Sequence, residues 1–474
     1  MKTHIKNLFI AFGLAAVFFF SQAQATTIFP IATNPGREYG LSFAFDGTNY
    51  LVGIWGDEIA DTNITAQLVS PTGALVGSRI KVGRTGSIPF VAFDGTNYLL
   101  VWRDDINSAT YNDDIYGQLI SRSGALVGSP FPITTDPGYQ APEAMSPVVF
   151  GAGKYLVVWR DESSGRAIYG RLFFTSGAPS SSEIMISAGG LDAPSAAVAF
   201  DGTNFLVVWQ QQTNASQQQY ETYGALITPA GTKGTNIIIS QTTSAGYAQL
   251  HLLFNGTNYF VTWSKDVGPG SPSPSDFDIY GRFVRPDGSF PGNEIALVTE
   301  TGDQVAPVLA FDGANYLLSW KEGALGSTNS NVKFQFFSPA GLAIGPPFAP
   351  FAAQGTNNPV LAAALFDGTR FAAIATLAGG DPNVKYGTSG DVYGMFIPKS
   401  TASPRLNVTG PLVGAQFSLT LTGTPGINYA VQVATNLSSP NWTAVVTNSP
   451  TNGTFSFTDT SATNKSRFYR AVKQ

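Results

Sequence analysis

The 474-residue sequence contains no cysteine, so neither a disulfide bond nor a thiol contributes to its stability or chemistry. Histidine is almost absent too, and His251 is the only one outside the N-terminal end. The common zinc-ligand patterns and a serine–histidine–aspartate triad therefore have almost no residues to use. No phosphate-binding loop, dinucleotide-binding fingerprint or Gly-x-Ser-x-Gly motif occurs. The motifs of this sequence identify no reaction.

Charged side chains are also scarce, at 12% of the residues, and the formal net charge is −5. A soluble domain usually has about a quarter charged residues, so polar uncharged side chains must cover much of this surface. The acidic balance argues against nucleic acid as a partner. Glycine (51 residues) and proline (30 residues) are abundant instead. This composition is typical of extracellular proteins built from many short strands and tight turns.

Long hydrophobic runs are absent except near the N-terminus. There, a short apolar stretch from Leu8 to Phe20 follows a basic start and precedes the small residues Ala23-Gln24-Ala25. This order predicts a secretory signal peptide over residues 1–25, with the mature chain beginning at Thr26. The stretch is too short to favour a membrane anchor, and no later segment is suited to span a bilayer. We expect a secreted protein that is extracellular or held at the cell surface.

One short phrase recurs along the chain and predicts its fold. Three clear copies and four weaker ones begin, in chain order, at Phe45, Phe93, Phe150, Phe200, Phe254, Phe311 and Phe366. Successive copies lie 48 to 57 residues apart, a period that suits a four-stranded propeller blade. The seven copies therefore predict an all-β chain whose main domain is a seven-bladed β-propeller.

Each copy predicts a tight hairpin and a buried strand. The phrase Asp-Gly-Thr-Asn supplies residues that tolerate the positive φ of a hairpin turn. The residues that follow, such as Tyr98-Leu99-Leu100-Val101-Trp102, are apolar on both faces, which fits a strand covered on both sides. A third strand, a second turn such as Ser70-Pro71-Thr72-Gly73, and a fourth strand complete the unit.

The last repeat lacks its fourth strand, and a matching segment stands at the other end of the mature chain. Residues 28–33 are similar to the fourth-strand segment 130–135. We therefore predict that the N-terminal strand completes the last blade and closes the ring over residues 26–403, which removes the exposed strand edges. The alternative, an open β-solenoid, does not account for the displaced strand.

The repeat resembles one found in secreted bacterial β-propeller proteins. The resemblance rests on Phe-Asp-Gly-Thr-Asn-Tyr-Leu-Val-Val-Trp with a later Asp-Ile-Tyr-Gly, and it covers residues 26 to about 400. It implies the architecture and says little about activity. Blades of the Gly-His…Trp-Asp type, double-glycine kelch blades and Asp-x-Asp-x-Asp-Gly calcium loops do not occur.

Residues 404–474 lack the repeat and predict a separate small β-sandwich. Tyr429-Ala430-Val431-Gln432, Leu437 with Trp442, and Phe468-Tyr469-Arg470 resemble a fibronectin-III-like sandwich found at the ends of large exported bacterial proteins. The segment is basic, because five lysines and arginines face the single acid Asp459. A basic module beside an acidic propeller suits attachment to anionic glycans or to the cell surface, and the alternative is a solvated spacer.

The order of strands and loops predicts where a site would lie. The two tight turns of each blade share one face, and the long irregular loops, such as 103–113 and 265–278, share the other. Function concentrates in variable loops on a rigid scaffold, so we expect the site on the irregular-loop face. The candidate ligand-binding residues there are Arg103, Asp104, Asp105, Tyr111, Arg160, Asp161, Glu162, Asp266, Asp278 and Glu322.

Acids recur on that face in two sets, one just after the buried tryptophans and one before the third strands (Asp114, Asp278 and Asp391). Two interpretations stay open. The acids and arginines bind a polar ligand or a hard cation such as Ca²⁺, or each acid caps a turn or pairs with a neighbouring basic residue. The aromatic residues Tyr111, Tyr139 and Tyr220 are candidates to stack on sugars.

We expect an exported, non-catalytic protein that binds or adheres to an extracellular glycan or protein and needs no cofactor. The alternatives are a carbohydrate-active hydrolase or lyase that uses propeller carboxylates, such as Asp104 with Asp161, and a structural component of the cell surface. Catalysis needs two acids in different environments, and equivalent acids around a ring argue against it. We expect His251 to be a satisfied core or channel histidine.

Overall fold

The protein is built from β-strands in every described part of the chain. The computed structural model describes residues 27–33, 37–57, 63–104, 113–141, 147–163, 165–187, 193, 195–214, 219–245, 249–268, 276–323, 331–351, 359–378, 390–399, 405–408, 416–423, 428–435, 441–449, 454–460 and 467–473. The predicted signal peptide, residues 1–25, lies outside these residues. Within them, no helix has the length and apolar character needed to cross a membrane.

Five antiparallel sheets follow one another along the middle of the chain. Each contains strands that are consecutive in sequence, as the repeat predicts. Their strands are β6 (Ser87–Phe93), β7 (Asn97–Asp104), β8 (Asp114–Ser121) and β9 (Leu126–Thr134); β10 (Gln140–Ala141), β11 (Val148–Gly151), β12 (Lys154–Asp161), β13 (Ala167–Phe174) and β14 (Ile184–Met185); β15 (Ala196–Phe200), β16 (Phe205–Asn214), β17 (Gln219–Ile227) and β18 (Ile237–Ala245); β19 (Leu250–Phe254), β20 (Tyr259–Asp266), β21 (Phe277–Val284) and β22 (Ile295–Val298); and β23 (Gln304–Phe311), β24 (Tyr316–Glu322), β25 (Asn331–Phe337) and β26 (Ala343–Phe348).

A further sheet joins the two ends of the repeat region. Its strands are β1 (Thr27–Ala32), β2 (Arg37–Phe45), β3 (Tyr50–Asp57), β4 (Asn63–Val69), β5 (Leu75–Thr85), β27 (Pro359–Phe366), β28 (Phe371–Ala378) and β29 (Gly390–Ile397). The N-terminal strand β1 pairs antiparallel with β29, with Thr27 opposite Phe396 and Ile28 opposite Met395. Arg37 of β2 also pairs with Gly390 of β29 in parallel. The N-terminal strand is thus the fourth strand beside β27–β29.

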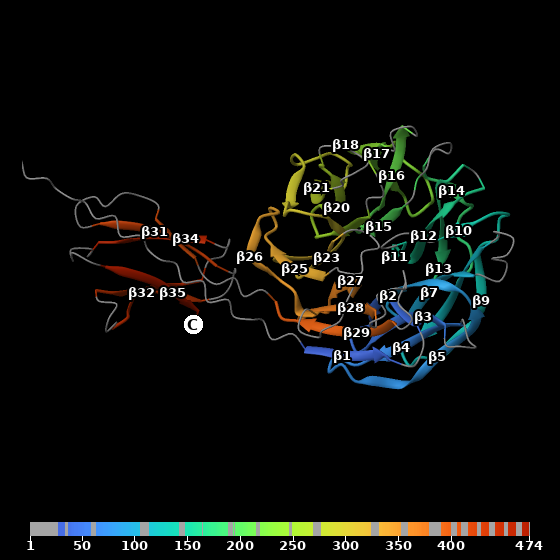
Figure 1. The fold of residues 1–474 in the computed structure, drawn as a ribbon, viewed down its shortest axis with the longest axis horizontal. Helices are drawn as coiled ribbons and strands as arrows, with labels where there is room; N and C mark the ends of the chain where they lie inside the picture. The colour runs from blue at the N-terminus through green and yellow to red at the C-terminus, as the bar shows by residue number, and fades with distance from the viewer. Residues whose placement is uncertain are drawn as a thin grey trace, which may run out of the picture.

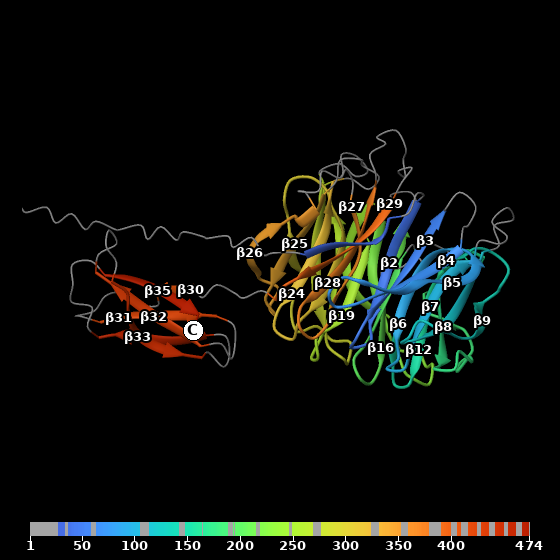
Figure 2. The same cartoon turned by 90° about the horizontal axis from the view of Figure 1, so that it is seen from below.

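Figure 1 shows these sheets arranged around a common centre, as in a β-propeller. The side view in Figure 2 shows their strands running between two faces of the molecule. The fold of this region is therefore all-β and propeller-like.

The recurring hairpin explains how each sheet begins. Oδ1 of Asp46 accepts hydrogen bonds from the backbone N–H groups of Thr48 and Asn49, both at 2.7 Å. Gly47 adopts a φ of 92°, which a side chain would disfavour. The equivalent Asp94 makes the same two contacts in the next sheet. The aspartate, the glycine and the asparagine together turn the chain from the first strand into the second.

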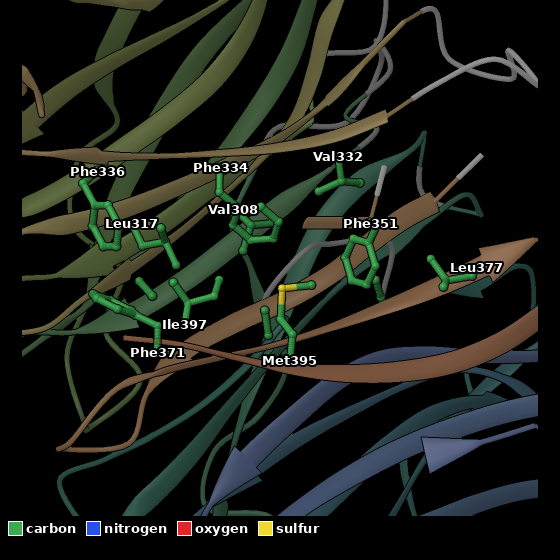
Figure 3. Packing of buried hydrophobic residues seen from close by; sticks show 13 residues of the cluster. Val308, Leu317, Val332, Phe334, Phe336, Phe351, Phe371, Leu377, Met395 and Ile397 are labelled. Carbon is green, nitrogen blue, oxygen red and sulfur yellow. The ribbon is translucent and has the colours of Figure 1, made fainter. Parts of the chain in front are cut away.

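The second strand of each sheet is covered on both faces. All five residues of Tyr98-Leu99-Leu100-Val101-Trp102 are fully buried, which confirms the prediction from their apolar run. The faces of neighbouring sheets bury them. Figure 3 shows one such interface, where Phe334 and Phe336 of β25 and Val308 of β23 pack toward Phe371 of β28 and Met395 of β29. Burial between sheets is the main source of stability in this region.

Tyrosine hydroxyls tie neighbouring sheets together at the hairpins. The tyrosine that opens the second strand donates to the asparagine carbonyl of the preceding hairpin, in the pairs Tyr98–Asn49 (3.0 Å), Tyr155–Asn97 (3.3 Å) and Tyr259–Asn204 (2.9 Å). Tyr50 donates instead to Oδ2 of Asp367, at 2.5 Å, and so joins the first hairpin to the last. Burial, and then the neighbouring aspartate, raise the pKa of these tyrosines well above the usual value.

The C-terminal segment forms two three-stranded antiparallel sheets. One contains β30 (Arg405–Val408), β31 (Phe417–Thr422) and β34 (Thr454–Asp459), and the other contains β32 (Tyr429–Ala434), β33 (Thr443–Asn448) and β35 (Phe468–Lys473). Leu421 of the first sheet packs with Tyr429 and Val431 of the second in one small core. The predicted separate sandwich therefore has its own core, and its fibronectin-III-like character stays a prediction.

Candidate active site

The acids that follow the buried tryptophans make contacts within their own loops. Oδ1 of Asp161 accepts hydrogen bonds from the backbone N–H (2.8 Å) and the hydroxyl (2.6 Å) of Ser163. Oδ1 of Asp266 accepts from the N–H groups of Gly268 (3.0 Å) and Asp276 (3.2 Å). Asp104 is buried and lies opposite Asp114 in its sheet. These hydrogen bonds of Asp161 and Asp266 are the ones expected if each acid caps a turn.

The charged neighbours of these acids are paired as well. Arg160 lies 3.0 Å from Glu162, and Glu322 lies 2.7 Å from Lys333. The Arg103 guanidinium lies 3.7 Å from Asp113 and donates a hydrogen bond to the Tyr139 hydroxyl. Ligand binding by these residues stays a prediction, and the structure offers each of them a partner within the protein.

Two predicted site residues, Asp105 and Tyr111, lie outside the described residues. Tyr220 is buried, with 7% of its surface exposed, because β17 holds it between the neighbouring strands β16 and β18. The prediction that Tyr220 stacks on a sugar is therefore wrong. The described part of the chain also contains no cluster of three acidic or histidine side chains suited to hold a metal ion.

Asp278 is a buried acid of the set that precedes the third strands. It lies on β21 directly opposite Lys265 of β20, and only 7% of its surface is exposed. Burial and then the charge of Asp276 raise the pKa of Asp278 to about 6, and the Lys265 ammonium opposes this rise. A carboxyl group with this pKa carries a proton for part of the time in mildly acidic solution.

A second carboxylate, Glu294, lies beside the same lysine. It precedes β22, and its Oε2 is 3.8 Å from the Lys265 ammonium. That ammonium also lies over the ring of Tyr280, 4.4 Å from its centroid. Burial raises the pKa of Tyr280, and the charges of Asp278 and Glu294 raise it further. Both carboxylates therefore lie near enough to Tyr280 to raise the pKa of its hydroxyl, and the Lys265 ammonium lies over its ring.

An open cavity of about 490 Å³ adjoins this group. Its lining residues come from β18, β21 and the segment between β21 and β22, and they are Ile238, Gln241, Arg282, Phe290 and Glu294. Asp278, Tyr280 and Arg282 alternate along β21, so their side chains share one face of that strand. Glu294 and Arg282 thus line a space that a ligand can enter, and Asp278 and Lys265 lie on the same side of the sheet without lining it.

The environments of the acids around the propeller are unequal. Burial opposes ionisation of Asp367, but hydrogen bonds from Tyr50 and from backbone N–H groups lower the pKa of that carboxyl. Burial and Asp276 raise the pKa of Asp278 instead. Asp367 belongs to a hairpin turn and Asp278 to the start of a third strand, so acids at different positions of the repeat differ in pKa. At Asp391, the counterpart of Asp278 in the last repeat, burial and the charge of Glu38 also raise the pKa. A proton donor and a base are therefore to be sought at different positions of the repeat.

Sequence reasoning selected Asp278 and missed Glu294 and Arg282. A comparison of the repeats contains the signal. Tyr280-Gly281-Arg282 on β21 repeats Tyr169-Gly170-Arg171 on β13, and a glutamate precedes the fourth strand in both sheets, Glu294 in one and Glu183 in the other. At that second glutamate, burial and then the charge of Asp136 raise the pKa of Glu183, and the Arg171 guanidinium lowers it.

His251 takes no part in this group. It lies on β19, and its Nδ1 accepts a hydrogen bond from the N–H of Leu309 on β23 at 3.4 Å. Part of its surface is exposed, but the surrounding protein removes water from the ring and lowers the pKa of His251 to about 4. The hydrogen bond agrees with the prediction of a satisfied histidine, which is neutral at ordinary pH.

No family model matches this sequence, and no curated protein matches it. Among solved structures, the chain is similar to a puromycin-hydrolyzing peptidase of Mycobacterium tuberculosis, with a TM-score of 0.45 and 12% identity over 82% of this chain. It spans 58% of the peptidase's own length. It is also similar to a subtype N10 neuraminidase-like protein of A/little yellow-shouldered bat/Guatemala (TM-score 0.42, 10% identity, 78% of this chain and 98% of that one). A thermostable family-43 glycoside hydrolase matches with a TM-score of 0.34 and 12% identity, over 56% of this chain and 94% of the hydrolase.

These neighbours contradict the predicted function of non-catalytic binding or adhesion. Proteins named as hydrolases stand among them, and they agree better with the hydrolase alternative. We therefore do not retain the binding or adhesion function. At these identities and TM-scores the neighbours supply no residue of a site.

Proposed function

We propose that this protein is a glycoside hydrolase that uses Asp278 and Glu294 beside the cavity between β18 and β21. One observation carries the proposal. Two carboxylates in different environments lie near Tyr280, since Asp278 has its pKa raised to about 6 and Glu294 lies 3.8 Å from the Lys265 ammonium. Hydrolysis of a glycosidic bond needs one protonated and one ionised carboxyl group.

In this proposal Asp278 is the proton donor. It transfers its proton to the glycosidic oxygen while the bond from that oxygen to the anomeric carbon breaks. Glu294 accepts a proton from the water molecule that attacks the same carbon. The Lys265 ammonium lies 3.8 Å from Oε2 of Glu294, and Lys265 is paired with Asp278 across the two strands. Each turnover consumes one water molecule and leaves Asp278 ionised and Glu294 protonated. Glu294 then releases its proton to solvent and Asp278 takes one up, which restores both carboxyl groups.

The test uses the purified full chain and a panel of polysaccharides, with released reducing ends as the readout. Asp278→Asn and Glu294→Gln should each lower the rate by about 10²-fold or more, the usual contribution of a general acid or base. Asp391→Asn and Glu183→Gln are matched controls from the corresponding places in other sheets, and they should retain activity. Release of no reducing ends from any polysaccharide, or full activity of Asp278→Asn, would contradict the proposal.

We also propose that residues 26–403 form a closed propeller of seven blades, with residues 404–474 as a separate module. Three contacts support closure. β1 pairs with β29, the Tyr50 hydroxyl donates to Asp367, and the Arg370 guanidinium donates to the carbonyl of Pro71. The innermost strands also touch in a cycle, in which β2 contacts both β6 and β27.

Export belongs to the same proposal. The N-terminal segment has the order of features of a signal peptide, and an extracellular location would bring the enzyme to polysaccharide substrates. The basic C-terminal module is then suited to hold the enzyme at an anionic surface. Expression of the full-length gene with detection of the processed chain outside the cell tests export, and a chain that stays unprocessed inside contradicts it.

A further inference from the structure

Arg282 is held rigidly at the wall of the cavity. Its Nη1 donates a hydrogen bond to the backbone carbonyl of Ile239 on β18, at 2.6 Å. Its guanidinium carbon lies over the ring of Phe290, 3.6 Å from the centroid. These two contacts fix the plane of the guanidinium group, because a stacked arginine with one anchored nitrogen has few other rotamers. The N–H donors of the Arg282 guanidinium group therefore keep a defined position beside the cavity.

These two contacts do not involve all the N–H donors of the Arg282 guanidinium group. Nε of Arg282 is buried and has no hydrogen-bond partner among the described residues. The nearest acid of the cavity, Glu294, lies beside Lys265 instead. A buried guanidinium N–H without a partner is costly, and such groups are normally satisfied by a protein atom, a water molecule or a ligand.

The repeat provides an internal comparison. Arg171 occupies the corresponding place on β13, opposite Val157 as Arg282 is opposite Val261. Like Arg282, it donates through Nη1 to a carbonyl of the preceding sheet, here that of Ile133 at 3.4 Å.

Arg171 differs from Arg282 in the partners of its other guanidinium N–H groups. Its Nε donates to the carbonyl of Ser181 at 3.1 Å, and its Nη1 lies 3.9 Å from Glu183. Arg171 is therefore a structural clamp between two sheets. Arg282 keeps the clamp to Ile239, its Nε has no hydrogen-bond partner among the described residues, and a cavity is open beside it.

We propose that Arg282 binds an acidic group of the substrate, so that the cavity accepts a saccharide bearing a carboxylate or a sulfate. The inference rests on the proposed function, because it assigns a substrate class to the same site. Guanidinium groups bind carboxylate and sulfate oxygens through paired, charge-assisted hydrogen bonds. Gln241 adds a polar side chain for sugar hydroxyls, and Phe290 supplies an apolar wall behind the guanidinium.

Binding is measured by titration calorimetry, with the purified full chain and three probes. The first is trigalacturonate, the second is its methyl ester, in which each carboxylate is replaced by a neutral ester group, and the third is a sulfated galactan oligosaccharide. Trigalacturonate or the sulfated probe should bind at least about tenfold more tightly than the methyl ester, the ratio expected of a charged hydrogen bond. The tighter probe identifies the acidic group, and its affinity should fall as salt is added.

The variants separate ligand binding from structure. Arg282→Gln should lower the affinity for the tighter probe by about tenfold or more, and Arg171→Gln should leave it unchanged. Arg282→Gln also removes the hydrogen bond to the Ile239 carbonyl. Arg282→Lys is therefore a second variant, which keeps the positive charge but lacks the paired donors of a guanidinium group. It should bind with intermediate affinity. Thermal unfolding of each variant shows whether it is folded.

Equal binding of acid and methyl ester, no binding of any probe, or unchanged affinity in folded Arg282→Gln would overturn the inference. Its failure can be distinguished from failure of the proposed function. Arg282-dependent binding without any bond cleavage would support the anion site and contradict the hydrolase. Cleavage of neutral polysaccharides that depends on Asp278, with no preference for acidic ones, would support the hydrolase and contradict the anion site.

Discussion

The acids of the repeat illustrate how neighbouring charges decide the role of a single residue. Asp161 and Asp266 both use Oδ1 to accept hydrogen bonds from nearby N–H or O–H groups of their own loops. Asp278 is buried, lies near Asp276 and has one cation opposite it. The same type of residue therefore serves a turn in one place and is suited to hold a proton in another.

The raised pKa of Asp278 predicts the pH dependence of activity. A general acid works only while it is protonated, so hydrolysis should decline as the pH rises through about 6, the pKa of Asp278. The measurement is the pH profile of kcat/KM on the best polysaccharide substrate. Lys265→Met removes the cation that lowers this pKa and should move the declining limb to higher pH. A limb that stays in place in this variant would show that another group controls it.

His251 predicts a pH dependence of stability with a definite sign. Its pKa in the folded protein is about 4, below the value of about 6.5 expected in an unfolded chain. Between these values the unfolded chain binds more protons, so this residue makes the protein less stable as the pH falls from about 6.5 toward 4. Chemical denaturation at several pH values measures the free energy of unfolding, which should fall less over this interval for His251→Gln than for the wild type. An equal fall in both proteins would contradict the lowered pKa of His251.

The hydrogen bond from Tyr50 to Asp367 predicts a stability effect at the junction of the first and last hairpins. Tyr50→Phe removes a buried donor to a charged acceptor and should lower the free energy of unfolding by about 2 kcal/mol. Tyr155→Phe is the matched control, because its 3.3 Å bond to a neutral carbonyl should contribute less. A smaller effect of Tyr50→Phe than of Tyr155→Phe, in thermal or denaturant unfolding, would be inconsistent with this contact.

At the scale of the elements, β1 is the strand whose position depends most on distant parts of the chain. It pairs with β29, more than 350 residues away along the chain, and it buries Ile31 and Ala32 almost completely. Phe29 lies 4.7 Å from Phe396, measured between ring centroids. The strand covers an edge that would otherwise expose unpaired backbone groups of β29.

Removal of β1 should therefore destabilise the repeat region. A chain that starts at residue 34 should lose at least about 3 kcal/mol of stability, the order of cost of deleting several buried side chains, and should associate through the exposed edge of β29. Thermal unfolding and size-exclusion chromatography measure both effects. A chain that starts at residue 26 is the control and should behave as the mature protein. Equal stability of the two chains would contradict the role of β1.

At the scale of the whole molecule, the repeat region and the C-terminal segment have separate cores. The C-terminal core centres on Leu421, Tyr429 and Val431. Beside it, the buried Asp459 accepts a hydrogen bond from Nε of Arg467 at 2.7 Å and one from the Tyr469 hydroxyl at 2.9 Å. These contacts join β34 to β35 and so link the two sheets of this segment.

Asp459→Asn should affect only the C-terminal segment. Replacing one partner of a buried ion pair leaves the other charge uncompensated, so this segment should lose about 3 kcal/mol of stability. Calorimetry should record a lower transition temperature for the smaller transition, with the larger transition and the hydrolytic activity unchanged. A shift of both transitions would show that the two parts unfold as one unit.

Much of the fold could be predicted from the repeat because its signals are local. Asp46, Gly47 and Asn49 determine a hairpin through contacts within four residues, and the run from Tyr98 to Trp102 is apolar on both faces. The match of residues 28–33 to a fourth strand predicted the pairing of β1, which the structure places beside β29. Little of the candidate site could be predicted in the same way. Asp278 was selected, but Glu294 and Arg282 carry no motif.

The sequence by itself therefore determined the strand pattern, the hairpins and the separate C-terminal sheets, because short-range spacing and burial patterns specify them. Only the tertiary structure decided which acids have a pKa far from the usual value. The pKa of Asp278 depends on Asp276 and Lys265, and Nε of Arg282 lacks the kind of partner that Arg171 finds in Ser181. Burial and the distance between charges set these properties, and both arise only when separate strands are brought together.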